Sequence, residues 1–294
     1  RSVHARTGGP RPVMPECNRS IRPRAMKEPI SGRRRILAAL LLGLAGRAGA
    51  QDEAAAAAGK AQATPADDEA HARARAIVQR ADEIRFPRDS FTVEVRVSST
   101  IRGEPQEPRR YRLMSRGSED TIIQTLEPAV DRGQNLLMRG RELWMFMPSV
   151  SQPVRLSLSQ RLTGQVANGD LARANFSGDY TPTIVGSEKI DGVAYTVLDL
   201  AAAQRGVTYP KVKYWVRASD AHPLKAEFYS VSGRLLKTCT YEDYKPLGGR
   251  TRPTKLVMTD ALKAGDVSVL TYSELKLVDL PDRFFTKDYM KRLD

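Results

Sequence analysis

The chain has 294 residues, with 47 Lys and Arg against 34 Asp and Glu, and a formal net charge of +13 at pH 7. Residues 1–50 hold 11 of the basic and 2 of the acidic residues, so residues 51–294 carry about +4, with 36 basic residues against 32 acidic ones. Clustered basic charge is the usual mark of phosphate binding. Because the excess is concentrated in the first fifty residues, we expect no nucleic-acid partner.

Residues 26–50 have the pattern of a secretory signal. Basic residues that include Arg33–Arg35 precede the apolar run Ile36–Gly46, and the small residues Ala48–Ala50 form a cleavage site. The apolar run is shorter than the roughly 18 residues that a membrane span needs. We therefore expect a cleaved signal, a mature chain that begins at Gln51, periplasmic localisation and no membrane-spanning segment. The general secretory route is favoured over the twin-arginine route.

The remaining chain divides by composition. Residues 1–25 lack hydrophobic periodicity and are interpreted as a non-functional leader upstream of the initiator Met. Residues 51–63 are rich in Ala and are predicted to form a disordered tether, and residues 64–294 are predicted to form a single domain. With Cys17 in the leader, Cys239 is left alone. It is expected to be a small core residue rather than a nucleophile.

The domain is predicted to begin with one amphipathic helix. Thr64 is a suitable N-cap, Pro65 suits the first helical position, and the helix should end before Pro87. Its apolar positions recur at helical spacing and predict one narrow stripe against a sheet. The stripe consists of Ala70, Ala74, Ile77, Ala81 and Ile84.

From Ser90 onward the hydrophobic period changes to two. Phe91, Val93, Val95 and Val97 alternate with polar residues, which indicates a strand with one buried face. The same reasoning predicts strands around 111–113 and at 121–126, 134–138, 142–147, 183–190, 193–200, 211–217, 224–230, 235–244, 254–259 and 267–277, with turns at 139–140, 191–192, 232–233, 248–249 and 264–265.

Short turns between successive strands favour one antiparallel meander. The segment from Ser157 to Tyr180 is the exception, because it lacks alternation and is rich in Ser, Gln, Gly, Asn and Asp. We expect a helical or irregular excursion there, and long excursions in compact domains are usually functional, for instance as lids. The strands and the helix together can close, or nearly close, a barrel that is either filled or able to hold an apolar ligand.

Several segments resemble one family. The hairpin and aromatic strand Leu136–Pro148, the block His222–Tyr229 with the preceding Val212–Val216, and Gly233–Tyr244 together with Pro253 to Thr286 are similar to LolA and the outer membrane lipoprotein-sorting proteins. The resemblance spans most of residues 91–293. It implies a mainly β fold, a half-open antiparallel β-barrel of about eleven strands, with helices that form a lid over an apolar cavity for acyl chains.

The resemblance also implies where the lipid cavity lies. In most strands we take the uniformly apolar face as the lining, but both faces of the strand at 142–147 are apolar, and the choice of Trp144 with Phe146 over Met145 with Met147 is arbitrary. LolA carriers use an inward Arg linked to lid opening, and Arg116 matches it best by position. The predicted lining is Phe91, Val93, Val95, Tyr111, Leu113, Trp144, Phe146, Val212, Tyr214, Val216 and Phe228.

The function that these expectations favour is a periplasmic carrier. It would shield the acyl chains of lipoproteins or another lipid and act as a monomer between an inner-membrane transporter and an outer-membrane acceptor. Two alternatives remain open: an RseB-like regulator that binds a membrane protein, which calls for a further domain, and a filled scaffold beside a transporter. We expect neither a cofactor nor a metal nor catalysis, because His71 and His222 are far apart in the sequence and no nucleophile elbow or phosphate loop is present.

Overall fold

The computed structural model describes residues 65–173 and 175–293. The predicted leader, secretory signal, tether and Thr64 cap lie outside the described residues. The helix α1 (Pro65–Arg85) ends two residues before Pro87, as predicted. Its buried face, however, contains Ala74, Val78 and Ala81, whereas Ala70 is exposed and Ile77 is half-buried. The buried stripe is therefore rotated slightly from the predicted one, and Val78 lies at the centre of the buried stripe.

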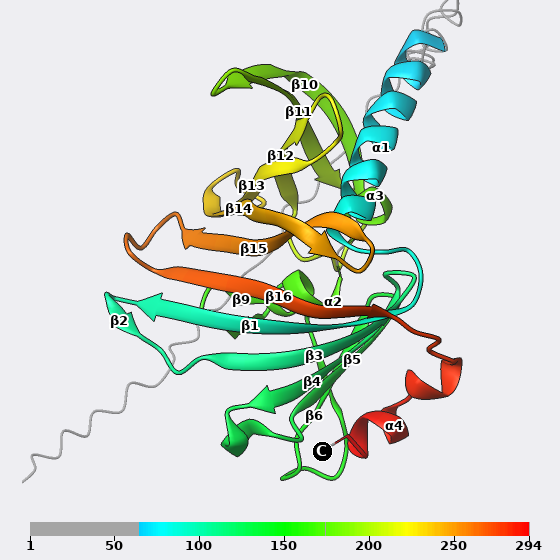
Figure 1. Cartoon of the computed structure of the whole chain (residues 1–294), viewed down its shortest axis with the longest axis vertical. Helices are drawn as coiled ribbons and strands as arrows, with labels where there is room; N and C mark the ends of the chain where they lie inside the picture. The colour runs from blue at the N-terminus through cyan, green and yellow to red at the C-terminus, as the bar shows by residue number, and fades with distance from the viewer. Residues whose placement is uncertain (1–64, 174, 294) are drawn as a thin grey trace, which may run out of the picture. The chain divides into compact units, whose positions relative to one another are not determined.

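The strands occur where the period-two pattern predicts them, and short additional strands accompany them. Figure 1 shows the strands as one large curved sheet beside α1. The strands are β1 (Phe91–Ile101), β2 (Glu104–Pro105), β3 (Arg109–Arg116), β4 (Asp120–Glu127), β5 (Asn135–Arg139), β6 (Glu142–Phe146), β7 (Val154–Leu156), β8 (Arg161–Thr163), β9 (Val166–Ala167), β10 (Tyr180–Ile190), β11 (Val193–Ala202), β12 (Lys211–Arg217), β13 (Pro223–Tyr229), β14 (Leu235–Leu247), β15 (Arg250–Asp260) and β16 (Val267–Leu277).

The main sheet is antiparallel throughout and has 14 strands, more than the eleven that the resemblance implied. Its order runs from β10 through β16, then β1, and from β3 to β7, with β2 paired to β1. The pairing of β16 with β1 joins the two ends of the meander at the centre of the sheet. Within the described residues, the outermost strands β10 and β7 do not pair, so the barrel is open, as the half-open fold requires.

The inner face of the sheet carries the main hydrophobic core. The alternating residues Val93, Val95 and Val97 of β1 are almost completely buried in it, and α1 contacts β10, β12 and β15 on the same side. Burial of a large aliphatic side chain contributes about 1.5–3 kcal/mol. This face therefore supplies most of the hydrophobic stabilisation of the domain.

The 157–180 segment forms the predicted excursion and covers part of the inner face. It contains the short strands β8 and β9 and the helices α2 (Asn168–Ala172) and α3 (Phe176–Asp179). Helix α2 contacts β4, whereas α3 contacts α1 and β10. Gly164 lies so close to the sheet that a Cβ atom there would be 2.2 Å from Ser99 Oγ. Its positive φ of +51° also favours glycine.

The chain ends on the outer face of the sheet. Residues 278–293, called the C-terminal segment below, contain a 3-10 helix η2 (Asp282–Phe284) and the helix α4 (Lys287–Lys291), which contacts β5 and β6 (Figure 1). Another 3-10 helix, η1 (Ala129–Asp131), follows β4. Within the described part of the chain, no helix is long and apolar enough to cross a membrane.

Candidate functional site

A small interior pocket lies between the inner face of the sheet and the 157–180 segment. Its volume is about 20 Å³, which is close to the space that one water molecule needs. The interior of this conformation is therefore filled by side chains. The pocket is lined by Arg85 of α1, by Gly169, Asp170, Arg173, Phe176, Asp179 and Tyr180 of the 157–180 segment, and by Thr208, Tyr209, Phe228, Cys239, Tyr241, Leu256 and Met258.

Apolar side chains of the 157–180 segment fill the space over the inner face. Leu158, Val166 and Leu171 are at most 5% exposed and belong to the main core. The Phe176 ring packs edge-on against Tyr214, with ring centres 5.3 Å apart. An acyl chain could therefore lie against this face only if the 157–180 segment moved away.

Arg85 is a buried cation on the inward face of α1. It continues the spacing of Ala74, Val78 and Ala81 and is 8% exposed. Its Nη1 donates to Asp82 Oδ1 at 3.3 Å, and its Cζ lies 4.4 Å from the centre of the Phe176 ring, within the range of a cation–π interaction. Its Nε has no hydrogen-bond partner among the described residues.

Asp82 connects this buried pair to the 157–180 segment. Its Oδ2 accepts a hydrogen bond from the backbone N–H of Ser177 at 2.7 Å. Burial raises the pKa of Asp82 above its ordinary value, although Arg85 and the Ser177 N–H act in the opposite direction. The carboxyl group is therefore held less firmly in its charged form than a surface aspartate.

Lys237 forms a second buried ion pair across the same boundary. It extends from β14 onto the inner face, and its Nζ donates to Asp170 Oδ2 and to the Gln165 carbonyl oxygen, each at 2.6 Å. Both side chains of the ion pair are at most 7% exposed. The Tyr209 hydroxyl also donates to Asp170, at 2.9 Å. The two oxygen acceptors that Lys237 finds in the described structure belong to the 157–180 segment.

A third buried ion pair lies within the 157–180 segment and ties it to turns of the sheet. Arg173, with a side chain 2% exposed, donates through Nε and Nη2 to Asp179 at 2.6 and 2.8 Å. Its Nη1 donates to the carbonyl oxygens of Gly140 and Ser118 at 2.9 and 3.2 Å. Arg141 also pairs with Asp179, at 2.9 Å. The segment is thus held by charge-assisted hydrogen bonds in addition to its buried apolar side chains.

Most residues predicted to line a cavity lie in the main core. Of these, Phe228 lines the interior pocket, and Tyr214 contacts the Phe176 ring. The others belong to the same core but are not among the residues that line the pocket. Those found in this core are Phe91, Val93, Val95, Tyr111, Leu113, Val212, Tyr214, Val216 and Phe228.

Strand β6 is the place where the face was assigned wrongly. Trp144 and Phe146 pack on the outer face, in a second apolar cluster with the C-terminal segment. Leu143 and Met145, one residue out of phase, pack in the main core. The prediction failed because both faces of β6 are covered, and period-two alternation therefore cannot distinguish them.

Arg116 also lies away from the interior. Its Nη2 donates to Asp120 at 2.6 Å and to Asp282 at 2.8 Å, and its Cζ lies 4.8 Å from the centre of the Phe285 ring. These contacts join β3 to the C-terminal segment on the outer face. This differs from the prediction that Arg116 is the inward Arg. Arg85, which contacts the 157–180 segment, and Arg173, which belongs to it, are the buried arginines described there.

The buried charges were missed for two reasons. Arg85 could have been found, because it lies four residues after Ala81 and continues the helical stripe, but only apolar residues were counted there. Lys237, Asp170 and Arg173 gave no comparable signal. Lys237 and Asp170 are far apart in the sequence, and Arg173 with Asp179 lies in a segment without periodicity, so nothing in the sequence indicates that these charges are buried.

Cys239 lines the interior pocket and is 1% exposed. Burial raises the pKa of its thiol to about 12. A thiol with such a pKa is almost entirely protonated near pH 7 and is a poor nucleophile. This agrees with the interpretation of Cys239 as a core residue.

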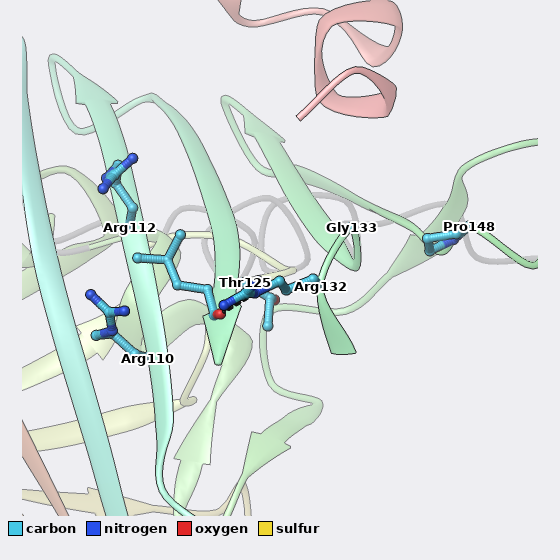
Figure 2. A pocket seen from close by; sticks show the side chains of 7 residues that line it. Arg110, Arg112, Thr125, Arg132, Gly133 and Pro148 are labelled. Carbon is cyan, nitrogen blue, oxygen red and sulfur yellow. Dashed lines mark hydrogen bonds between the residues drawn. The ribbon is translucent and has the colours of Figure 1, made fainter. Parts of the chain in front are cut away.

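A second hollow, of about 440 Å³, lies near the ends of β3 and β4 and has three arginines among its lining residues. Figure 2 shows Arg110 and Arg112 on one side of it and Arg132, Gly133 and Pro148 on the other. Arg110 and Arg112 are engaged with Glu94, at 3.0 and 2.8 Å. This hollow contains none of the residues predicted to bind lipid.

Three solved structures are similar to this chain. A LolA superfamily protein from Nitrosomonas europaea is 58% identical, with a TM-score of 0.71, and the match covers 74% of this chain and 98% of the other. A putative outer membrane lipoprotein-sorting protein domain from Vibrio parahaemolyticus is 22% identical (TM-score 0.65, coverage 76% and 100%). A DUF1329 family protein from Desulfovibrio piger is 20% identical (TM-score 0.64, coverage 75% and 99%). The last two support the fold alone.

The open antiparallel sheet, with a helix and a covering segment on its inner face, defines the class of LolA-like folds. The identity and coverage of the Nitrosomonas match show that the chain belongs to the LolA superfamily. A family model described only as an uncharacterized protein matches residues 117–292. A comparison with curated proteins found no match.

Proposed function

We propose that this protein is a periplasmic carrier that binds acyl chains of lipoproteins or another lipid against the inner face of its sheet. The observation that carries the proposal is the contrast between that face and its cover. The face is mostly apolar, whereas the 157–180 segment adds buried charge pairs, including Asp170 with Lys237, to its apolar contacts with that face. Such pairs lose much of their Coulombic energy to desolvation, which favours a cover that can open.

The energetics of acyl binding fit an opening mechanism. Each buried methylene contributes about 0.8 kcal/mol, so a long acyl chain can replace the contacts that Leu158, Leu171 and Phe176 make with the inner face. The protein would then exchange one apolar filling for another. Release at an acceptor would reverse the exchange, since the 157–180 segment can occupy the face again.

The predicted secretory signal and the superfamily support periplasmic localisation. The solved relative from Vibrio parahaemolyticus is described as a putative outer membrane lipoprotein-sorting protein domain. By extension, we propose a donor at the inner membrane and an acceptor at the outer membrane. Binding without catalysis is the role that we assign to the interior.

A filled scaffold is the second candidate function, and the small interior pocket favours it. With a volume of about 20 Å³, this interior pocket has no room for an acyl chain. A scaffold would keep the 157–180 segment in place permanently. A carrier would open and close.

Purification without detergent, followed by native mass spectrometry and lipid extraction, tests the proposal. We expect a copurified acyl lipid or lipoprotein, and uptake of a fluorescent acyl probe after delipidation. A bare protein that also ignores acyl probes would contradict the carrier and support the scaffold.

A further inference from the structure

The interior contains more positive charge on the sheet and α1 than an apolar acyl site requires. Arg85 of α1 and Lys237 of β14 are both buried, at 8% and 6% exposed. Buried charged groups are costly unless they are paired and fully hydrogen-bonded. Two such groups in one interior therefore call for an explanation beyond packing.

The partners of Lys237 in this conformation come from the cover. Its ammonium group donates to Asp170 and to the Gln165 carbonyl oxygen, and both belong to the 157–180 segment. Its remaining acceptor among the described residues is the sulfur of Met258 at 3.7 Å, which is a weak one. When the 157–180 segment moves away, Lys237 is left facing the inner surface without an oxygen partner from the described residues.

Arg85 has unused hydrogen-bonding capacity even in this conformation. Its Nε lacks a partner within the described residues, and the contact with Asp82, at 3.3 Å, is long for a charged hydrogen bond. The Tyr214 hydroxyl, in the same aromatic surroundings, is also buried without a partner in the described chain. Unsatisfied buried polar groups are rare in native proteins and are often functional.

Movement of the cover would also uncover Arg85. The Phe176 ring of the 157–180 segment lies over the guanidinium at 4.4 Å, and its neighbour Ser177 donates its N–H to Asp82. Asp170 and Asp179 would leave with the segment. Arg173 belongs to the segment and would leave as well. Of the three buried ion pairs described above, Arg85, Asp82 and Lys237 would then remain, and these three residues together carry one excess positive charge.

We propose that the interior selects acyl ligands with an anionic headgroup, a carboxylate or a phosphate, which Arg85 and Lys237 bind after the 157–180 segment has moved. The ligand anion takes the place of the Asp170 carboxylate on Lys237 and supplies the acceptor that Arg85 Nε lacks. The acyl chain occupies the apolar inner face. This proposal rests on the proposed carrier function and specifies its ligand class.

Matched ligands test the charge requirement. The delipidated full-length protein is equilibrated by dialysis with radiolabelled oleic acid at a pH where it is ionised, with 1-oleoyl lysophosphatidic acid, and with the uncharged oleyl alcohol. We expect at least one anionic ligand to bind at least tenfold more tightly than oleyl alcohol, because hydrogen bonds between charged groups are stronger than those of a neutral hydroxyl. If oleic acid alone does so, the preferred anion is a carboxylate.

Two single variants connect that preference to the named residues. Arg85→Met and Lys237→Met should each lower the ratio of anionic to neutral affinity by at least threefold. The ratio cancels a change in segment opening that acts on both ligands alike, and circular dichroism checks that each variant is folded. Arg85→Lys should retain part of the preference. Arg112→Met is the control and should leave the ratio unchanged. Arg112 is a half-exposed cation on the face of β3 that points away from the interior, where it pairs with Glu94.

The failures of the two proposals are distinguishable. Equal affinity for charged and uncharged oleyl ligands, or a ratio that neither Arg85→Met nor Lys237→Met alters, would overturn the headgroup proposal while the carrier function stands. If no oleyl ligand binds, both proposals are overturned.

Discussion

The two faces of the sheet are covered in different ways. On the outer face, the C-terminal segment inserts Phe285 and Met290, both completely buried, into an apolar cluster. On the inner face, the 157–180 segment buries apolar side chains such as Leu158, and in addition the ion pairs Lys237–Asp170 and Arg173–Asp179. Apolar anchors stabilise without a desolvation penalty for charge, whereas buried ion pairs must offset one. In the proposed carrier, this difference makes the outer cover permanent and the inner cover removable.

The largest expected effect is on the permanent cover. Phe285→Ala should lower the free energy of unfolding by about 3–5 kcal/mol, because it removes a completely buried aromatic ring. Urea denaturation measures this change, and Phe285→Leu, which keeps most of the apolar volume, should cost clearly less. A loss below about 1 kcal/mol for Phe285→Ala would show that the C-terminal segment is not an integral part of the fold.

The next effect is on the removable cover. Asp170→Asn leaves Lys237 buried without its ionic partner, a change that costs about 3–5 kcal/mol when the structure cannot relax. We expect the 157–180 segment to open locally instead, so that global stability falls by less than this amount. In Asp170→Asn we expect Cys239 to react with a thiol reagent on the order of 100-fold faster than in the unaltered protein. The rates are measured in a Cys17→Ser background, so that Cys239 is the reacting thiol.

A matched control for that prediction is Asp220→Asn. Asp220 pairs with Arg217 at a site that is one-third to two-fifths exposed, and its loss should not alter the Cys239 reaction rate. If Asp170→Asn reacts no faster than this control, the ion pair does not hold the segment closed.

Replacing the inner ion pair with apolar side chains should strengthen the cover. In Asp170→Leu/Lys237→Met the desolvation penalty disappears, and comparable replacements are neutral or stabilising by about 1–4 kcal/mol. Reaction of Cys239 should slow by about tenfold, and uptake of an acyl probe should slow with it. Faster uptake in this variant would contradict the idea that closure limits access.

The smallest expected effects concern pH, and they have opposite signs on the two faces. Burial raises the pKa of Asp82, so its contribution to stability is complete below the ordinary value of 3.8 and is lost as pH rises through the raised pKa. Hydrogen bonding to Arg116 and the charge of Arg139 lower the pKa of Asp282, so its contribution is present above 3.8 and is lost as pH falls through the lowered pKa.

The matched variants separate these two dependences. Relative to the unaltered protein, Asp82→Asn should become more stable as pH rises above 3.8, whereas Asp282→Asn should become relatively more stable as pH falls below 3.8. Unfolding curves at several pH values measure both trends. The same sign for both variants would contradict the assignment.

The fold was largely predictable because most strands bury one face. The alternation of Val93, Val95 and Val97 specified both the strand and its orientation, and the turn residues separated the strands correctly. Strand β6 was predicted as a strand but with the wrong face, since the inner core and the C-terminal segment bury it on both sides. A pattern that depends on one solvated face contains no information there.

The candidate site was predictable only in outline. The composition of residues 157–180 indicated a covering excursion, but the charges that hold it depend on distant pairs. Lys237 and Asp170 are 67 residues apart, and the sequence around each of them is typical of a surface residue. Arg85 is the exception, because a charged residue in an otherwise buried helical stripe is itself a signal.

One measurement tests most directly whether the 157–180 segment must leave the inner face for acyl chains to bind. A Cβ atom at Gly169 would lie 3.0 Å from Thr208 Cβ, near the roughly 3.5–4.5 Å of a disulfide. Gly169→Cys/Thr208→Cys, with Cys17→Ser and Cys239→Ser, can thus link the segment to the loop before β12. We expect no uptake of a fluorescent fatty acid when this disulfide is oxidised and full uptake after reduction. Equal uptake in both states would contradict the account.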